Sequence, residues 1–285
     1  MSWRTVAEGD LLDVKRSRLG WGVAITLFAF TAGIGILAAL SDYFNGPDVP
    51  APQFELIMLT VGALLAFILP FVAMLASYNA IVHERETGSV RFLLGLPNSR
   101  LDAYLGKYVS RSVVYLLATL VGLVVLGGAG FAVLREPAAL DFLLFALATF
   151  AFGLVFVGFG LACSAIFDSE TSVTSAVVGT YVLFRGGWMI IQWGGLYLTR
   201  PNGETTARPY PDWYFFLGRA NPMNAYAKVV DVLFNNGSPI PIITAPGPPV
   251  NTVATSTEYA VLALVAWIVV IPVLGYLRFR SRDVL

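Results

Sequence analysis

Long apolar runs without a charged residue dominate the chain, and short polar segments separate them. Each run is continuous, without the alternation of polar and apolar residues that marks a membrane β-strand. About 20 apolar residues in helix cross the hydrocarbon core of a bilayer, where backbone groups need partners within the same segment. The pattern therefore predicts an all-α integral membrane protein with six transmembrane helices, in a single domain over residues 1–285. The predicted spans are about 19–41, 56–82, 108–134, 140–167, 171–199 and 259–277.

Lysine and arginine are distributed unequally between the two sides of the predicted bundle. The N-terminal segment, the loop between the second and third spans and the C-terminal tail together carry 12 of the 18, and five lie in the segments on the other side. Positive residues near span ends mark the cytoplasmic side. We therefore expect both termini in the cytoplasm and a multi-pass protein of the cell membrane.

Composition supports a membrane protein and excludes several kinds of site. Apolar residues make up 57% of the chain and charged residues 13%, about half the charged share of a soluble domain. The net charge of zero gives no footprint for nucleic acid. One histidine and one cysteine cannot form the common zinc motifs, and neither a phosphate-binding GxxxxGK[ST] loop nor a GxSxG motif is present. We expect no catalytic residue and no metal site in this chain.

The loop between the second and third spans is unusually apolar for a cytoplasmic segment. Over 89–96, several apolar residues lie on one face of a short helix that Pro97 ends. Ser99 then begins a second helix, with Asp102 as its capping-box partner, that continues into the third span. Two interpretations follow: an amphipathic helix on the inner leaflet, or an apolar ridge that a cytosolic partner grips.

Two motifs resemble those of a known family. The first comprises Glu84-Arg85-Glu86-Thr87-Gly88-Ser89, Leu94-Gly95-Leu96-Pro97-Asn98-Ser99-Arg100 and Leu105-Gly106-Lys107. It is similar to the E-R-E-x-G-[ST], L-x-L-P-x-S-R and L-G-K pattern of the ABC-2 type transporter permeases. The second, Asn221-Pro222-Met223-Asn224-Ala225-Tyr226, resembles an element of the branch that includes the permease of nitrous oxide reductase maturation systems.

This resemblance implies partners and a mechanism. Permeases of the family have six spans, work as homo- or heterodimers and bind two separate ABC ATPase subunits, which hold the ATP and Mg; this chain itself would bind no cofactor. An N-terminal amphipathic helix and the loop between spans two and three contact the ATPases. The helix would be 1–18 here, where Trp3, Val6, Asp10 and Val14 lie at helical spacing. The ATPase-coupling loop of this chain would comprise Glu84, Arg85, Glu86, Gly88, Arg91, Leu94, Leu96, Pro97 and Arg100, with Gly88 in a turn that needs a positive φ.

The predicted outer loop, 200–258, contains one clear helix signal. Asn221 is a suitable N-cap, Pro222 a suitable first helical residue, and Gly237 follows the end. We expect this helix to lie on or dip into the outer membrane surface. An accessory protein outside the membrane is an alternative partner for this loop.

Arg185 is the only charged residue in the interior of a predicted span, away from its ends. A charge in lipid is costly, so one interpretation makes Arg185 a pathway or gating residue. The other ends the fifth span at Arg185, with the side chain reaching outward and 186–199 forming a re-entrant segment. His83 and Cys163 are expected to be an interfacial and a packing residue.

The favoured function is therefore the membrane permease subunit of an ABC-2 exporter, driven by a separate ATPase and moving an unknown substrate. One alternative is a membrane subunit that transmits force to an outside protein. A secondary transporter is a second alternative, although the interiors of the spans lack the Asp or Glu that ion coupling usually needs. An intramembrane enzyme would need a set of acid, base, nucleophile or metal groups there, and the span interiors offer one Arg, one Cys and no carboxylate.

Overall fold

The computed structural model describes residues 2–16, 21–22, 25–26, 28–33, 36–37, 40, 53–88, 99–133, 138–200, 210–234 and 252–281, and within these ranges it contains helices and no strand. The first predicted span, 19–41, lies largely outside the described residues. The short helix predicted over 89–96 also lies outside them, together with Arg91, Leu94, Leu96 and Pro97 of the predicted coupling loop.

Five helical segments in the described ranges are long and apolar enough to cross a membrane. They are α5 (Gln53–Leu75), α8 (Arg100–Val133), α9 (Ala139–Ile166), the segment Glu170–Thr199 and α14 (Thr257–Ser281). These five match the second to sixth predicted spans. The second ends earlier than predicted, at Leu75, because the Ser77 hydroxyl bonds the carbonyl of Val157 on α9 at 2.8 Å and the chain turns before the short helix α6 (Val82–Glu86).

The predicted start of the helix that continues into the third span is confirmed. The backbone N–H of Asp102 donates to Ser99 Oγ at 3.0 Å, and the backbone N–H of Ser99 donates to Asp102 Oδ2 at 3.3 Å. These reciprocal bonds form a capping box, which satisfies two free donors at the start of a helix. Helix α8 then continues without interruption to Val133.

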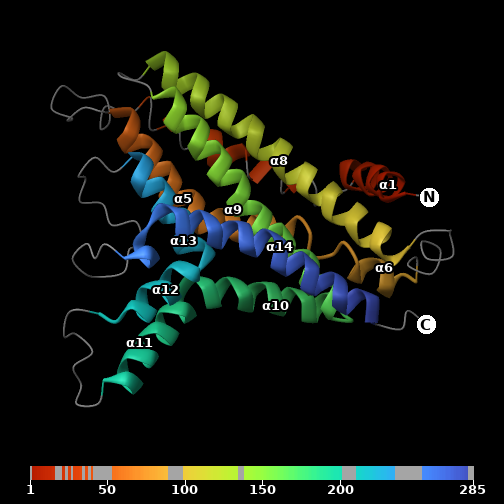
Figure 1. Ribbon diagram of the computed structural model, residues 1–285. Coiled ribbons are helices and arrows are strands. Elements are labelled where there is room, and N and C mark those ends of the chain that lie inside the picture. The colour runs from red at the N-terminus through yellow and green to blue at the C-terminus, as the bar shows by residue number, and fades with distance from the viewer. Residues whose placement is uncertain are drawn as a thin grey trace.

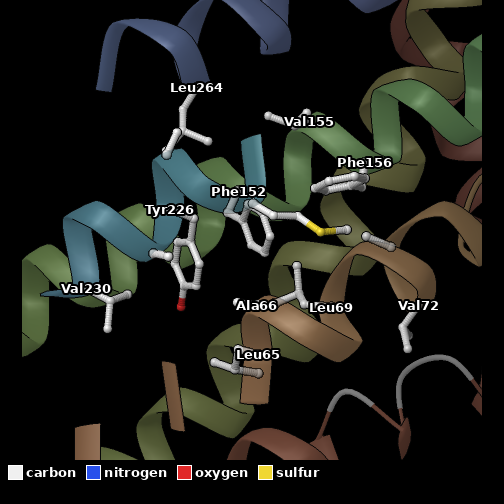
Figure 2. Close-up of a cluster of buried hydrophobic side chains, with 14 of the residues drawn as sticks. Leu65, Ala66, Leu69, Val72, Phe152, Val155, Phe156, Tyr226, Val230 and Leu264 are labelled. Carbon is white, nitrogen blue, oxygen red and sulfur yellow. The ribbon is translucent and has the colours of Figure 1, made fainter. Parts of the chain in front are cut away.

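Helix α13 (Pro222–Phe234) lies in the core of the helix bundle, and its expected position on or within the outer membrane surface stays a prediction. It packs against α5, α9 and α14, and Figure 2 shows Tyr226 and Val230 among side chains of these helices. Most of its apolar side chains are fully buried, and these buried residues occur on more than one face of the helix. Gly62 on α5 permits the close approach, because a Cβ there would lie 2.5 Å from Val230 Cγ1.

The second motif explains how α13 is held in the core. Asn221 is the predicted N-cap: its Oδ1 accepts from the Met223 backbone N–H at 2.8 Å, and its Nδ2 donates to the Phe184 carbonyl at 2.7 Å. The Tyr226 ring stacks on Phe152 with centroids 4.3 Å apart, and its hydroxyl lies 3.0 Å from Thr149 Oγ1. The motif therefore joins α13 to α9 and to the long segment Glu170–Thr199.

Different helices form the two ends of the bundle. Figure 1 places α1 (Trp3–Arg16), α6 and the C-terminal end of α14 at one end, and α11 (Trp188–Thr199) and α12 (Asp212–Ala220) toward the other. The N-terminal helix, the C-terminal end of α14 and the α6 base of the first motif therefore lie at the same end of the described bundle.

Candidate functional site

The first motif forms the base of the loop that connects α6 to α8. Glu84, Arg85 and Glu86 lie on α6, and Gly88 follows it with a φ of 74°, the left-handed conformation that favours glycine. This confirms the predicted turn at Gly88. Arg100 is the first residue of α8, so the described part of the motif brackets residues 89–98 on both sides.

A buried cluster of four charges joins this base to the N-terminal helix. Lys107 Nζ lies 2.5 Å from Glu84 Oε1 and 3.4 Å from Asp10 Oδ1. Arg111 Nη2 donates to Asp10 Oδ1 at 3.0 Å, and the Ser110 hydroxyl donates to Asp10 Oδ2. Two carboxylates thus face two cations, and the cluster spans α1, α6 and α8. We refer to Asp10, Glu84, Lys107 and Arg111 as the ion cluster.

Burial makes the ion cluster sensitive to any change in its balance. The side chains of Lys107 and Asp10 are only 4% and 6% exposed. Burial alone would raise the pKa of the Asp10 carboxyl, but the cations of Lys107 and Arg111 and the Ser110 hydroxyl outweigh it and hold the pKa below its usual value. Asp10 is therefore charged in the folded protein at neutral pH, and its ion pairs weaken only when the pH falls through this lowered pKa.

Arg85, Glu86 and Arg100 each bind a different helix end. Arg85 Nη1 donates to the carbonyls of Ala165 and Phe167 at the end of α9, both at 3.2 Å. Glu86 Oε1 accepts from the backbone N–H of Glu170 at the start of α10 (Glu170–Val182), at 2.9 Å. Arg100 Nη1 donates to the Arg280 carbonyl at the end of α14, also at 2.9 Å. Positive side chains at helix C-termini and a carboxylate at an N-terminus complement the helix dipoles.

His83 adds to the contact with α10. Its Nδ1 lies 2.9 Å from Glu170 Oε1, so α6 holds the first residue of α10 by two side chains. From the sequence, His83 was expected to be an interfacial residue. Its partner Glu170 could not be predicted because it is 87 positions away in the chain. Asp10 was also missed as a site residue, although an acidic residue on the apolar face of a helix is a signal of a buried partner.

Gly106 of the first motif allows α1 to pack closely on α8. A Cβ at this position would lie 2.7 Å from Val6 Cβ and 2.8 Å from the Trp3 carbonyl oxygen. The Trp3 backbone N–H also donates to Asp102 Oδ1 at 3.1 Å. The Leu105-Gly106-Lys107 element thus supplies both the close contact with α1 and the central cation of the ion cluster.

Replacing Gly106 with alanine is expected to loosen α1. The new methyl group would overlap Val6, and because α1 lies at the edge of the bundle and can shift, we expect a cost of about 1 kcal/mol, the low end for overpacking. Hydrogen exchange of the α1 amides, followed by mass spectrometry, measures the effect. The matched control is Gly9→Ala on α1, where a Cβ meets no atom within 4 Å. Equal protection of α1 in both variants would contradict the packing role of Gly106.

Arg185 lies in a widened turn within the long segment Glu170–Thr199. The π-helical turn Leu183–Gly187 connects α10 to α11, and Figure 1 shows a bend there. The helix therefore continues through Arg185 rather than ending at it. The guanidinium carbon lies 4.8 Å from the ring centroid of Phe67 on α5, and the side chain is exposed. The pathway hypothesis for Arg185 stays a prediction.

No metal-binding group of three or more His, Cys, Asp or Glu side chains occurs within the described ranges. The chemistry of the site is instead that of paired charges and helix ends, arranged around the base of one loop.

Comparison with known proteins assigns the family. The profile of the family described as "ABC-2 family transporter protein" matches residues 4–284. The chain is 28% identical to a probable ABC transporter permease protein NosY of Stutzerimonas stutzeri, over 97% of each chain. It is 31% identical to a protein of the same description from Pseudomonas aeruginosa, over 63% of this chain and 66% of the relative. The chain therefore belongs to the ABC-2 transporter family, as a multi-pass membrane permease subunit.

Proposed function

We propose that the chain couples ATP hydrolysis on separate ATPase subunits, which hold the ATP and Mg, to export of a substrate across the cell membrane. One observation carries the proposal. Four of the five described charged residues of the first motif each anchor the base of the loop to a different part of the bundle. Glu84 binds the cluster on α1 and α8, Arg85 the end of α9, Glu86 the start of α10 and Arg100 the end of α14.

This arrangement suits an element that transmits force. Residues 89–98 lie between two stems that are held by charged contacts, so a push on them is shared by five helices. A partner ATPase that closes on ATP would tilt these helices together. In a dimer of permease subunits, such a tilt would open and close a pathway between the subunits.

The predicted coupling residues fall into two groups, according to whether a partner within the chain is described for them. Glu84, Arg85, Glu86 and Arg100 have partners within the chain, so we propose that they anchor the loop. Gly88 forms the turn after α6, and direct contact with the ATPase then falls to the four remaining predicted residues, Arg91, Leu94, Leu96 and Pro97. Leucine side chains flanked by an arginine are suited to an apolar groove with an acidic rim.

Leu94→Asp is expected to abolish association with the ATPase. The experiment is affinity purification of the chain from native membranes and mass spectrometry for an ABC ATPase subunit. A new carboxylate in an apolar groove is desolvated without a partner, so the ATPase should be lost. The matched control is Val253→Asp, because Val253 is 70% exposed in the predicted outer segment. Absence of an ATPase from folded wild-type preparations, or its retention by Leu94→Asp, would contradict the proposal.

Force transmission to an outside protein is a second candidate, favoured by the contacts of α12, the helix that precedes α13. The Trp267 indole of α14 donates to the Ala220 carbonyl at 2.7 Å, and the Trp188 indole of α11 donates to the Leu217 carbonyl at 2.8 Å. Helices α12 and α13 are thus tied to two membrane helices and would move with them. An outside protein that co-purifies with wild type and is lost on Phe216→Asp, at a half-exposed position of α12, would support this candidate over export of a solute.

A further inference from the structure

Helix α1 and helix α6 are separated by an open pocket rather than packed together. The pocket has a volume of about 360 Å³ and is lined by Asp13 and Val14 of α1, Asn79 of the preceding turn, and His83 and Thr87 of α6 and its end. Side chains in direct contact fix the distance between two helices, but a pocket of this size leaves it free to vary. Arg85 and Glu86 hold α6 against α9 and α10, so a separate contact is needed to link α6 directly to α1.

The ion cluster is the connection that crosses this gap. Lys107 contacts Glu84 on the α6 side and Asp10 on the α1 side, and Arg111 binds both Asp10 and the Ala76 carbonyl at the start of the turn, the latter at 3.3 Å. Asp10 is the centre of this network, because it has contacts with Lys107, Ser110 and Arg111. These three partners all lie on α8.

We propose that Asp10 is a positioning residue for the coupling loop: acting through Lys107 and Arg111, it makes the N-terminal helix part of the device that fixes the base of the loop. This inference rests on the proposed function. Without Asp10, Lys107 would keep Glu84 as its counter-ion but would lose the carboxylate on α1. The stem of the loop would then keep its contacts with α9 and α10 but lose this link to α1, so the distance between α1 and α6 could vary.

A distance measurement tests the proposal directly. Spin labels on Leu12→Cys in α1 and Thr87→Cys after α6 report the separation of the two elements in the full chain in lipid, with the native Cys163 changed to serine. Wild type should give one narrow distance peak. Asp10→Asn keeps the size of the side chain and removes its charge, and we expect loss of the narrow peak. Asp10→Glu restores the carboxylate and should recover the peak.

A double variant distinguishes positioning from a role in stability alone. Asp10→Asn combined with Lys107→Met leaves one carboxylate, Glu84, and one guanidinium, Arg111, in the cluster, so the charges balance and the protein should fold even if Asp10→Asn does not. A positioning role predicts that this double variant unfolds near the wild-type temperature but still lacks the narrow peak. Recovery of both the unfolding temperature and the peak would overturn the proposal, because Asp10 would then act only by balancing charge.

Co-purification separates this inference from the proposed function. Residues 89–98 are unchanged in Asp10→Asn, so a bound ATPase should be retained in that variant. If wild type holds no ATPase, the proposed function fails while the distance measurement still reports on Asp10. If the ATPase binds and the narrow peak survives Asp10→Asn, the proposed function stands and the positioning role of Asp10 is wrong.

Discussion

Replacing Lys107 with methionine is expected to destabilise the protein more than any other single change at the candidate site. The side chain is 4% exposed and lies between two carboxylates. Breaking a buried ion pair by removing one partner costs about 3–5 kcal/mol. We expect about 3 kcal/mol, the lower end of that range, because Arg111 still faces Asp10 and the Glu84 side chain is 27% exposed. Chemical unfolding in detergent, followed by circular dichroism, measures the loss.

Two further variants show whether charge is the cause. Lys228→Met is the matched control, since Lys228 is half-buried on α13 and far from the ion cluster in the chain, and we expect a change within about 0.5 kcal/mol. Adding Glu84→Gln to Lys107→Met removes the carboxylate left without its cation, and much of the stability should return. An equal loss with and without Glu84→Gln would mean that the lysine stem, rather than its charge, stabilises the site.

The ion cluster gives a common physical reason for residues that lie far apart in the sequence. Gly106 brings α1 close to α8, Lys107 links α1 to α6, and Glu84 passes that link to the stem of the loop. Each of these residues would be unremarkable in isolation. Together they allow a charged, rigid base to form at the end of an otherwise apolar bundle, where the bundle meets the loop.

Local signals predicted the elements well. Continuous apolar runs located five long helices, and capping residues located two helix starts, at Ser99 and at Asn221. The positive φ of Gly88 was likewise expected from its place in a turn. These features depend on neighbours within a few residues, and such neighbours are visible in a single sequence.

Long-range partners were beyond the same reasoning. Arg100 was predicted to contact an ATPase, but its guanidinium binds a carbonyl 180 positions away. Asp10 was recognised only as a member of a helical stripe, and its partners Lys107 and Arg111 belong to another helix. Helix α13 was predicted from Asn221, Pro222 and Gly237, but these local signals did not reveal that its side chains pack in the core of the bundle. Pairing across the bundle depends on tertiary packing, which spacing along one chain does not encode.

Replacing Gly153 with alanine is expected to destabilise the protein although alanine favours helix. In an exposed helix the change from glycine to alanine stabilises by about 0.5–1 kcal/mol. Gly153 lies within α9 against the ring of Tyr115 on α8, and a Cβ there would overlap the ring and its hydroxyl. Tyr115 cannot swing away, because it is fully buried and its hydroxyl donates to the Thr149 carbonyl at 2.7 Å. We expect a loss of about 3 kcal/mol in the free energy of unfolding, the upper end for overpacking.

The control and the double variant make the cause of this loss measurable. Gly128→Ala on α8 adds the same methyl group where no atom lies within 4 Å, so it should be neutral or stabilising. Gly153→Ala combined with Tyr115→Leu removes the overlapping ring, and its cost should be smaller than the sum of the two single changes. Simple additivity in this cycle, or a stabilising Gly153→Ala, would show that the contact between α8 and α9 can open. The Tyr115 ring, stacked over Gly153 and bonded to Thr149, is expected to prevent that, and it would thereby hold α8, whose first turn carries Arg100, in fixed register with α9, whose last turn receives Arg85.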